Sequence, residues 1–422
     1  MSNQAIGISI PTPNADVPTP KSEQSAGRST GFVGHAKLIS VLTLCSRILG
    51  MLRESVMASY FGATVVAQSF TVAFAIPNLF RKLLGEGALS AAFIPLYAKA
   101  LKSGDEKEAQ EFAAASVNML GTILIGLTIA GEIVLWLLPK VVHFRSDNLL
   151  VVRFTAIMLP YVILVCGTAF LSGVLQVHKR FALPALTQVP LNLMHVVVII
   201  TGARLLMLKP GVANEALQIR LAYWLSFFVL VAGCLQVTML IPALRRTGFR
   251  LMWVGNFWTP AVRKLLKLSL PVAFSAGVLQ ISVLLDKGIT LFLTQGENPA
   301  EKLHLFGSTF NYPMVLGAAA RLNWAQMLYQ FPLGVFAIAV ATAIFPSLSA
   351  DAHDQDGEKF KRVLRQGIMF TLLEGLPASI GLILVRNPTI RLLFQHGSFT
   401  AADSHLMSMS VLFYSAAIWA FS

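Results

Sequence analysis

Four basic side chains lie in two neighbouring apolar stretches of the chain, within residues 46–95. They are Arg47, Arg53, Arg81 and Lys82, and the acidic residues of the same region are Glu54 and Glu86. A charged side chain near the centre of a bilayer costs about 2.5–3.5 kcal/mol on insertion scales. Cations retained at that cost indicate a water-filled cavity that receives an anionic ligand.

A diphosphate is the chemical complement of this cluster, because guanidinium groups bind phosphate oxygens through paired, geometrically selective hydrogen bonds. At about 100° per residue, Glu54 falls on nearly the same helix face as Arg47, whereas Arg53 is turned by about 120°. Lys82 and Glu86 have the i,i+4 spacing of helical ion pairs. The glutamates can orient cations and still leave positive charge for the ligand. The competing interpretation, an internal ion pair or a side chain reaching the membrane interface, is the stronger one for Lys82 and Glu86 taken singly.

The elements that must position these side chains are apolar segments long enough to cross a bilayer. The chain has 422 residues, of which 55% are hydrophobic and 13% are charged. A soluble domain carries about 25% charged residues, so the composition indicates an all-α integral membrane protein. About 20 apolar residues make one span. The sequence predicts about ten transmembrane helices: Ala36–Phe61, Thr64–Leu101, Phe112–Pro139, Leu149–Val177, Pro184–Leu208, Ile219–Leu244, Val262–Thr294, Leu322–Ala350, Val363–Val385 and Ala402–Ser422.

The second of these segments is too long for one straight span. Pro77 is expected to kink it, because proline lacks a backbone donor and clashes with the preceding turn. Gly85, Gly87 and Pro95 are expected to loosen the part that follows. The second segment is therefore predicted to be a kinked helix with a loosened lower half.

Basic residues gather on one side of the predicted spans. If the amino terminus is inside, the inner connections carry most of them, above all Arg245, Arg246, Arg250, Arg263, Lys264 and Lys267. The positive-inside rule then places both the amino terminus and the end of the tenth helix at the cytoplasmic face. Residues 1–35 are rich in Pro, Ser and Thr, have no signal-peptide pattern, and are predicted to form a flexible cytoplasmic tail.

The chain also repeats itself. Pro95 and Pro346 follow similar residues, and Asp105 and Asp356 lie in similar Gly-Asp-Glu-Lys and Asp-Gly-Glu-Lys runs, both at an offset of 251 residues. Repeated halves are typical of secondary transporters, whose substrate sites lie between them. The sequence predicts two pseudo-symmetric lobes, with helices one to six in residues 36–244 and helices seven to ten in residues 245–422. The second lobe is expected to be incomplete, as in a chain truncated after Ser422.

Enzymes and metal proteins fit the sequence poorly. Cys45, Cys166 and Cys234 lie far apart within apolar runs and form neither a disulfide framework nor a metal pattern. A membrane glycosyltransferase or acyltransferase would need acidic or His/Asp clusters at one interface, and the connections contain no such cluster. No cofactor is expected. A drug or cation antiporter would carry a carboxylate in its cavity, where this chain has cations.

Several motifs resemble those of a known family. The run SRILGMLRE, followed by VAFAIPNLFRKLLGEGALSAAFIPLYA, is similar to the signature of the MurJ/MviN lipid II flippases. These proteins form part of the multidrug/oligosaccharidyl-lipid/polysaccharide exporter superfamily. In the second half, FPLGVFAIAVATAIFPSLS and LFQHGSFTAADS are similar to the same family. The resemblance covers about residues 36–422.

The resemblance implies a function. The family moves the undecaprenyl-pyrophosphate-linked peptidoglycan precursor, lipid II, from the inner to the outer leaflet of the bacterial inner membrane by alternating access. Its inward-open cavity uses arginines of helices one, two and eight, which the resemblance places at Arg47, Arg53, Arg81 and Lys82; Glu86, spaced to pair with Lys82, is added to this predicted substrate-binding set. Lipid II or a similar polyprenyl-diphosphate saccharide would be the ligand, and membrane lipids the surroundings.

Two positions depart from the family pattern. Gln68 stands where the family has an aspartate early in helix two, and Met327 stands where it has an arginine in helix eight. Arg321 is a candidate substitute for that arginine, and the 296–323 connection is longer than usual. These departures leave open an exporter of another lipid-linked saccharide, a drug or cation antiporter, or a non-transporting paralogue.

Three further polar residues lie in apolar helices. Asp286, beside Lys287, is either a locally paired carboxylate or, by resemblance to family members that bind sodium there, a ligand for a coupling sodium ion or proton. His195 and Asn192 are predicted as buried polar groups whose hydrogen bonds are satisfied.

Overall fold

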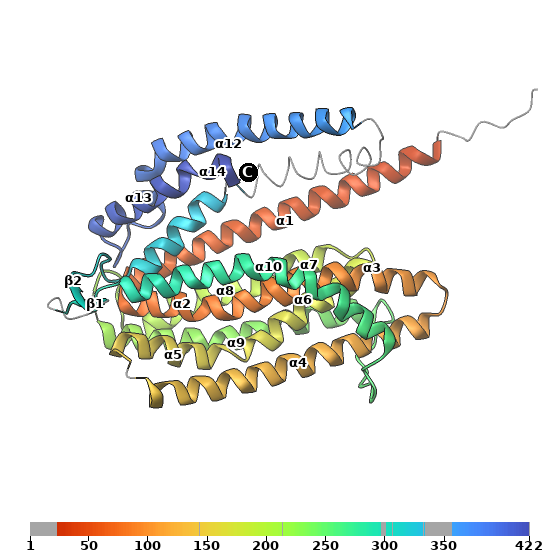
Figure 1. Ribbon diagram of the computed structural model, residues 1–422, viewed down its shortest axis with the longest axis horizontal. Coiled ribbons are helices and arrows are strands. Elements are labelled where there is room, and N and C mark those ends of the chain that lie inside the picture. Colours follow the sequence, from red (N-terminus) through yellow and green to blue (C-terminus); the bar gives the residue numbers. More distant parts are fainter. Residues whose placement is uncertain are drawn as a thin grey trace, which may run out of the picture.

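The protein is a bundle of long helices that run back and forth between two ends (Figure 1). The computed structural model describes residues 23–142, 144–212, 214–296, 301–305, 307–331, 333 and 357–421. Within these ranges the side chains are described from residue 41 onward, apart from residues 86–90, 146–147, 279, 305 and 421. The repeated motif around Pro346 therefore lies almost entirely outside the described residues.

The first part of the bundle contains the helices that carry the basic cluster. Its elements are α1 (Glu23–Phe61), α2 (Val65–Phe80), the π-helix η1 (Arg81–Ala88), α3 (Leu89–Lys102), α4 (Glu106–Val141), α5 (Ser146–Met158), α6 (Tyr161–Val177), α7 (Ala182–Leu186), α8 (Gln188–Leu205) and α9 (Glu215–Arg245).

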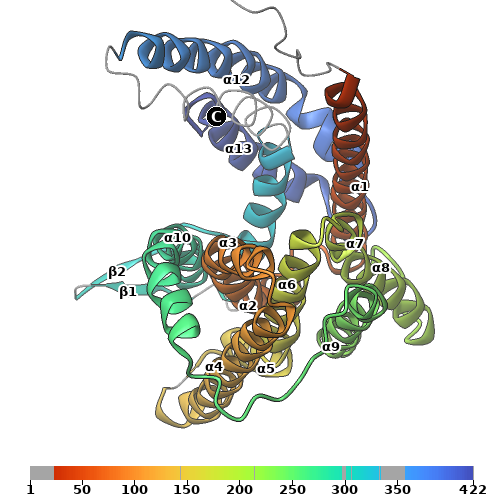
Figure 2. The same ribbon diagram turned by 90° about the vertical axis from the view of Figure 1, so that its right-hand side faces the viewer.

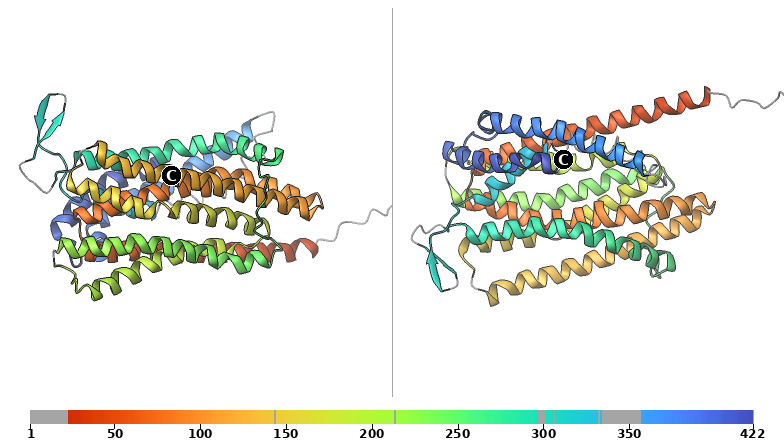
Figure 3. Two further views of the ribbon diagram at one scale, coloured as in Figure 1. Left: turned by 90° about the horizontal axis from the view of Figure 1, so that it is seen from below. Right: turned by 45° about the horizontal axis from the view of Figure 1, so that its top comes forward.

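The second part begins with a long helix and a small hairpin. Its elements are α10 (Pro260–Leu293), β1 (Leu303–Leu305), β2 (Ser308–Phe310), a helix over residues 318–331, α12 (Glu358–Leu393), α13 (Ala401–Ala416) and α14 (Ile418–Phe421). The two strands pair antiparallel and project from one end of the bundle (Figure 3). Helices dominate the described residues, as predicted, and this hairpin is the small exception.

Side-chain caps mark several helix starts. The Thr64 hydroxyl accepts a hydrogen bond from the Ala67 N–H at 3.4 Å, and Thr259 does the same for Val262 at 3.3 Å. Thr400 and Asp403 form a capping box at the start of α13. These caps satisfy backbone donors that the first helical turn leaves unpaired. They allow short connections between antiparallel neighbours.

The two ends of the bundle can be told apart by their connections. We call the end with β1, β2 and the turns at residues 62–64, 206–214 and 394–400 the hairpin end. The other end has the turns at residues 103–105, 178–181 and 246–259, and we call it the Gly104 end. Figure 2 looks along the bundle from the Gly104 end.

Six predicted spans agree with helices, whereas α1 begins at Glu23, so the last part of the predicted flexible tail is helical. In the described residues, five stretches are long and apolar enough to cross a membrane: Glu106–Val141, Ala182–Leu205, Glu215–Arg245, Pro260–Leu293 and Glu358–Leu393. A sixth is the pair α5 and α6, bent by 48°. All six fall on predicted spans. The total of ten remains a prediction, since α1, the α2–α3 region, the 318–331 helix and α13 do not meet the same test.

The apolar surface is distributed as a bilayer requires. Large apolar side chains are exposed on α4, α10 and α12, among them Trp136, Phe274 and Leu384. The packed core lies instead among α2, α5, α6, α8 and α9, where Phe154, Val165 and Leu225 are almost fully buried. Exposed apolar surface on this scale fits contact with lipid tails, because a soluble monomer seldom exposes large apolar patches.

The second predicted span is distorted after Pro77 rather than at it. The α-helix continues through Pro77 to Phe80 and then widens into the π-helix η1, which contains Gly85. A proline lacks the N–H of one helical bond, and glycine adds backbone freedom, so together they favour an irregular turn. The irregular turn begins at Arg81, which is the residue that the chemistry of the site singles out.

Helix α10 packs against α2, η1 and α3, whereas α12, α13 and α14 pack against one another. Viewed along the bundle, α12 and α13 lie on one side of the molecule and α4 and α5 on the other (Figure 2). The end of α1 and the turn that precedes α13 come close at the hairpin end (Figure 1). Of the two elements that carry the basic residues, η1 packs among α2, α3, α6 and α10, whereas α1 packs mainly against α8 and α7.

Contacts at the hairpin end join the two parts of the chain. The Ser398 N–H donates to the Ser59 carbonyl at 2.8 Å, and the Ser398 hydroxyl donates to the Tyr60 carbonyl at 3.3 Å. The same hydroxyl accepts from the Gly211 N–H at 3.1 Å. We call this contact region between residues 59–63 and residues 317 and 397–398 the hairpin-end seam.

Two glycines let the backbones of the hairpin-end seam approach closely. Gly397 has a φ of +59°, and a Cβ on it would lie 2.3 Å from the Ser59 carbonyl oxygen. Gly317 has a φ of +79°, and a Cβ there would lie 2.0 Å from the Ala63 carbonyl oxygen. Any other residue would meet both steric overlap and an unfavourable backbone conformation at these positions.

Candidate substrate cavity

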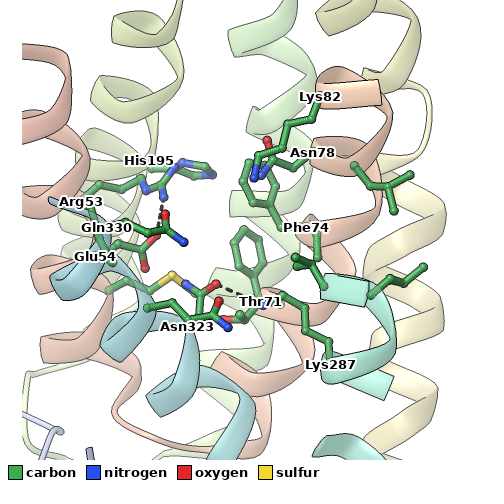
Figure 4. Close-up of a pocket in the computed structure, with 18 of the residues that line it drawn as sticks. Arg53, Glu54, Thr71, Phe74, Asn78, Lys82, His195, Lys287, Asn323 and Gln330 are labelled. Atoms are coloured by element: carbon green, nitrogen blue, oxygen red, sulfur yellow. Dashed lines mark hydrogen bonds and ion pairs between the residues drawn. The ribbon is translucent and has the colours of Figure 1, made fainter. Parts of the chain in front are cut away.

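Three neighbouring cavities occupy the middle of the molecule. The central cavity, of about 280 Å³, lies between α1, α2, η1, α8, α10 and the 318–331 helix (Figure 4). The arginine cavity, of about 360 Å³, adjoins it and shares Arg53, Asn78 and Met327 with it. The side cavity, of about 380 Å³, shares Arg81 and Gln188 with the arginine cavity. The cavities therefore form one series.

The predicted basic cluster lines this series. Arg47, Arg53 and Arg81 all line the arginine cavity. Arg53 also lines the central cavity, together with Lys82 (Figure 4). Arg47 and Arg53 come from α1 and Arg81 and Lys82 from η1, so two separate elements direct their cations toward the same space. The prediction that the three arginines project into one cavity agrees with this geometry.

Arg53 is held on three sides. One guanidinium nitrogen donates to the Asn192 Oδ1 at 3.1 Å, and another forms an ion pair with Glu54. The guanidinium carbon also lies 5.9 Å from the centre of the Phe74 ring, a cation–π arrangement. Asn192 in turn donates to the Ser46 carbonyl at 3.4 Å. This polar network fixes the direction of Arg53, and it satisfies Asn192 as predicted.

Glu54 connects the arginine to the second part of the chain. Its side chain is buried, at 6% exposure, and its second carboxylate oxygen accepts from the Trp324 indole N–H at 2.8 Å. The indole is itself fully buried. The helix-face argument put Glu54 beside Arg47, but the carboxylate pairs with Arg53, the next residue along the chain. Long side chains on adjacent positions can meet when both turn toward a polar cavity.

A fifth cation, Lys287, completes the central cavity. It is buried at 9% exposure and donates from Nζ to the Asn323 Oδ1 at 3.1 Å (Figure 4). Arg81 is oriented in a similar way, since its Nε donates to the Asn78 Oδ1 at 2.9 Å. Asparagine oxygens orient cations without neutralising them. The sequence indicated Lys287 only as a neighbour of Asp286. Helix periodicity alone does not show whether Asp286 or Lys287 faces the cavity.

His195 departs from its prediction. The ring is buried at 3% exposure and lines the central cavity, yet neither ring nitrogen has a hydrogen-bond partner among the described residues. It packs edge-on against Phe70 and Phe74, with ring centres 6.0 and 5.7 Å away. Buried polar groups are almost always hydrogen-bonded. The prediction that His195 is satisfied is therefore wrong within the described residues, and its nitrogens are available to a ligand.

The two positions that depart from the family pattern have different surroundings. Met327 lines both the central and the arginine cavity, so the cation expected there is replaced by an apolar side chain in the cavity wall. Gln68 is buried at 1% exposure, and its Oε1 accepts from the Ala319 N–H at 3.3 Å. Gln68 thus joins α2 to the start of the 318–331 helix and is absent from the cavity walls given above.

Arg321 does not substitute for the missing arginine. It is buried at 5% exposure and pairs with Asp403 at 3.0 Å, while it also donates to the Val315 carbonyl at 2.9 Å. These partners lie near the hairpin end. Arg321 therefore ties the 318–331 helix to α13 instead of facing the arginine cavity.

Two other predicted site residues stand apart from the cavities. Asp286 is exposed on α10 and lines neither the central nor the arginine cavity, whereas its neighbour Lys287 faces inward. The described residues contain no group of three or more His, Cys, Asp or Glu side chains that would hold a metal ion. The Glu86 side chain lies outside the described residues, so the predicted pair with Lys82 is not tested.

Comparison with known protein families shows which family has this arrangement of helices and motifs. The family model described as "Lipid II flippase MurJ" matches residues 57–422 of the chain. This chain belongs to the MurJ family. The resemblance carried by the sequence motifs is thereby confirmed, and because the family consists of transporters, the chain is not expected to be an enzyme. The matched region begins after Arg47 and Arg53 and includes Arg81 and Lys82.

Individual MurJ relatives agree. A probable lipid II flippase MurJ of Rhizobium tropici is 32% identical over 371 residues, which is 86% of this chain and 64% of that protein. A lipid II flippase MurJ of Burkholderia cenocepacia is 29% identical, over 88% of this chain and 67% of its own length. The chain thus spans about two thirds of the MurJ relatives that it matches.

Solved structures place the MurJ chain in a wider fold group. A lipid II flippase MurJ in an inward closed conformation has a TM-score of 0.68 at 24% identity, covering 91% of this chain and 73% of that one. An inward-facing multidrug resistance MATE family transporter of the MOP superfamily has a TM-score of 0.63 at 11% identity, covering 90% and 82%. At these identities the likeness concerns the fold, which is the MurJ/MATE fold of membrane transporters.

Proposed function

We propose that this chain is a flippase for lipid II or a closely similar polyprenyl-diphosphate saccharide. It carries the lipid from the inner to the outer leaflet of the bacterial inner membrane by alternating access and so serves peptidoglycan biosynthesis, cell wall biogenesis and cell shape. The amino terminus and the Gly104 end face the cytoplasm. Arg47, Arg53, Arg81 and Lys82 bind the diphosphate, with Glu86 as an orienting carboxylate.

The observation that carries the proposal is the convergence of cations from separate helices on connected cavities. Arg47, Arg53 and Arg81 line one cavity, and Arg53, Lys82 and Lys287 line the next. A lipid-linked diphosphate is the kind of membrane ligand that needs several cations together. Charge-assisted hydrogen bonds to phosphate are roughly twice as strong as neutral ones, and Arg forms them in pairs.

The seam supports the direction of access. Among the described residues, the hydrogen bonds that join α1, α2 and the 206–214 turn to segments after α10 lie between Glu54 and the hairpin end. Helix α10 packs along α2, η1 and α3, but α1 and the 318–331 helix are joined toward the hairpin end, which suits entry of a ligand between them from the other end. If the hairpin end is the outer face, the cavity loads from the inner leaflet.

A drug or cation antiporter finds less support in the same cavity. Its carboxylate, Glu54, is already engaged by Arg53 and by the Trp324 indole, so it is poorly placed to attract a cationic drug. The remaining charges of the wall are positive. An anionic ligand is therefore the better match.

Asp286 belongs to the proposal as a coupling-ion ligand. It lies next to the inward-facing Lys287 but on the exposed side of α10. A ligand for sodium or a proton in this position would respond to the position of α10 without contacting a diphosphate bound in the central or arginine cavity. Replacing Asp286 by Asn should then abolish any dependence of transport on sodium or on the proton gradient, while diphosphate binding stays unchanged.

The main test is complementation of cells depleted of their own lipid II flippase. Arg47→Ala and Arg53→Ala should each abolish growth while the protein still accumulates in the membrane, because one charge-assisted contact is worth about 1.5–3 kcal/mol. Arg→Lys should rescue only partly, since an ammonium cannot make the planar two-pronged contact. Arg204→Ala is the control, because Arg204 is exposed near the end of α8 and absent from the walls of the central and arginine cavities.

Binding by the purified protein separates the alternatives. The unmutated chain should bind undecaprenyl diphosphate in detergent, and Arg53→Ala should weaken that binding at least 10-fold. Normal growth with both arginines replaced would contradict the cavity mechanism. Binding of the diphosphate without complementation would instead favour the non-transporting paralogue.

A further inference from the structure

The side cavity differs chemically from the two cationic cavities. Its wall is made of α1, η1, α6, α7, α8 and α9 and contains hydroxyl and amide side chains, among them Thr43, Ser172, Gln176 and Gln188. Among the described residues of this wall, Arg81, at the boundary with the arginine cavity, is the charged one. A space lined by uncharged donors and acceptors is unsuited to a second phosphate group but well suited to a polar, neutral ligand.

The side cavity continues from the arginines in one direction. Along α1, Thr43 lies one helical turn before Arg47, and along η1 Gly85 lies about one turn after Arg81. Since α1 runs toward the hairpin end and η1 runs away from it, both steps lead toward the Gly104 end, by about 6 Å. A group bonded to a diphosphate that rests on Arg47 and Arg81 would reach this cavity next.

One buried polar side chain of the wall forms no hydrogen bond within the described part of the chain. Ser172 is only 7% exposed, and its hydroxyl has no hydrogen-bond partner among the described residues. Other polar groups of the wall are engaged, since Gln236 donates to the Thr187 carbonyl at 2.7 Å and accepts from the Tyr161 hydroxyl at 3.1 Å. A buried hydroxyl without a partner is uncommon, because its desolvation is not compensated by a hydrogen bond.

We propose that the side cavity binds the sugar that is bonded to the diphosphate of the transported lipid. Side-chain amides and hydroxyls both donate and accept, which matches the hydroxyl and N-acetyl groups of a saccharide. Phe181 adds an aromatic surface of the kind on which a sugar ring packs. The inference rests on the proposed function and adds to it. The cations bind the diphosphate, and the side cavity makes the protein bind a lipid with a sugar more tightly than the same lipid without one.

The inference is tested with two lipids on the purified full chain in detergent. One is undecaprenyl diphosphate, and the other is undecaprenyl diphosphate carrying a single N-acetylhexosamine. The variant combines Ser172→Ala with Gln176→Leu, which removes two polar partners and keeps most of the side-chain volume. Gln366→Leu is the matched control, because Gln366 is exposed on α12 and lies outside the side cavity.

We expect the variant to bind the sugar-bearing lipid at least about 10-fold more weakly than the unmutated chain and to bind the bare diphosphate equally well, because the two lost hydrogen bonds are made to the sugar. The control should change neither affinity. Retained binding of the bare diphosphate also shows that the variant is folded.

Three outcomes would overturn the inference, and they differ from one another. If the unmutated chain binds neither lipid, the proposed function fails and the sugar site fails with it. If it binds both lipids and the variant does so equally well, the function stands but the side cavity is only a hydrated space. If the variant loses both lipids to the same extent, and Gln188→Leu does likewise, the wall supports the arginines and does not read the sugar.

Discussion

At the scale of single residues, the cavity is organised around Arg53. Its guanidinium is shared among Asn192, Glu54 and the Phe74 ring, so its position is fixed before any ligand arrives. Glu54 then connects it to Trp324 in the second part of the chain. Preorganised cations bind a phosphate without first ordering a flexible side chain, which otherwise lowers affinity. The pair Arg53–Glu54 is therefore both a ligand site and a contact between helices.

The Glu54 network predicts a graded loss of stability. Glu54→Ala leaves the buried Trp324 indole without an acceptor and Arg53 without its ion pair, which should lower the free energy of unfolding by about 1–3 kcal/mol. Glu54→Gln keeps one oxygen for the indole and should lose less. Thermal unfolding of the purified protein in detergent provides the measurement, with Glu111→Ala, an exposed position on α4, as the control. Equal stability of Glu54→Ala and the control would contradict this account.

His195 predicts the opposite combination of effects. Because its ring nitrogens are buried without partners, His195→Phe should leave the thermal stability unchanged or raise it, as removing an unsatisfied polar group is often neutral or favourable. The same change should weaken binding of undecaprenyl diphosphate several-fold if the imidazole contacts the headgroup. His195→Gln, which restores a donor and an acceptor, should recover part of the affinity. A stability loss in His195→Phe with unchanged binding would assign the ring a packing role only.

At the scale of elements, the hairpin-end seam depends on backbone approach more than on side chains. At Gly397 and at Gly317, a carbonyl oxygen of the first part of the chain lies only 2.3 and 2.0 Å from the position that a Cβ would occupy. Ser398 adds hydrogen bonds to Ser59 and Tyr60. A seam of this kind is sensitive to one added methyl group, because neither backbone has room to move aside.

Gly397→Ala should therefore open the hairpin end. Its matched control is Gly104→Ala, since Gly104 also has a positive φ, +89°, yet nothing lies within 4 Å of the Cβ that it would gain. The three native cysteines of the protein are first replaced, and a single cysteine is placed at Thr71, in the central cavity. The measurement is the rate at which a membrane-impermeant reagent, added outside intact cells, labels this cysteine. Gly397→Ala should speed the labelling and Gly104→Ala should not. Identical rates would mean that the seam does not limit access.

The sequence allowed the elements to be predicted better than their contacts. Six predicted spans coincide with helices that can cross a membrane, because twenty apolar residues leave little choice of structure. The clustering of Arg47, Arg53 and Arg81 was also predictable, from the cost of charge in lipid. The partner of Glu54, the role of Lys287 and the orphaned His195 were not, because each depends on which helix lies opposite. The seam, made of backbone atoms, leaves almost no trace in the sequence beyond its glycines.

At the scale of the whole molecule, orientation is the prediction that underlies all the others. With the amino terminus in the cytoplasm, a cysteine at Gly104 should react with an impermeant reagent only from the inside, and a cysteine at Thr64 only from the outside. Both positions lie in short turns at opposite ends of the bundle. Labelling of the Gly104 position from outside intact cells would reverse the direction of transport and the role of the seam.

The shortness of the hairpin-end seam has an electrical consequence. Water that fills a polar cavity as deep as Arg53 would carry the potential of the cytoplasm to that depth, so that most of the membrane voltage falls across residues 59–63 and 397–398. Each elementary charge that crosses this thin barrier exchanges about 2.3 kcal/mol with the field per 100 mV. A bound diphosphate offsets part of the positive charge of the cavity, so the loaded cavity carries less charge than the empty one. We therefore expect the voltage to act mainly on the return of the unloaded protein.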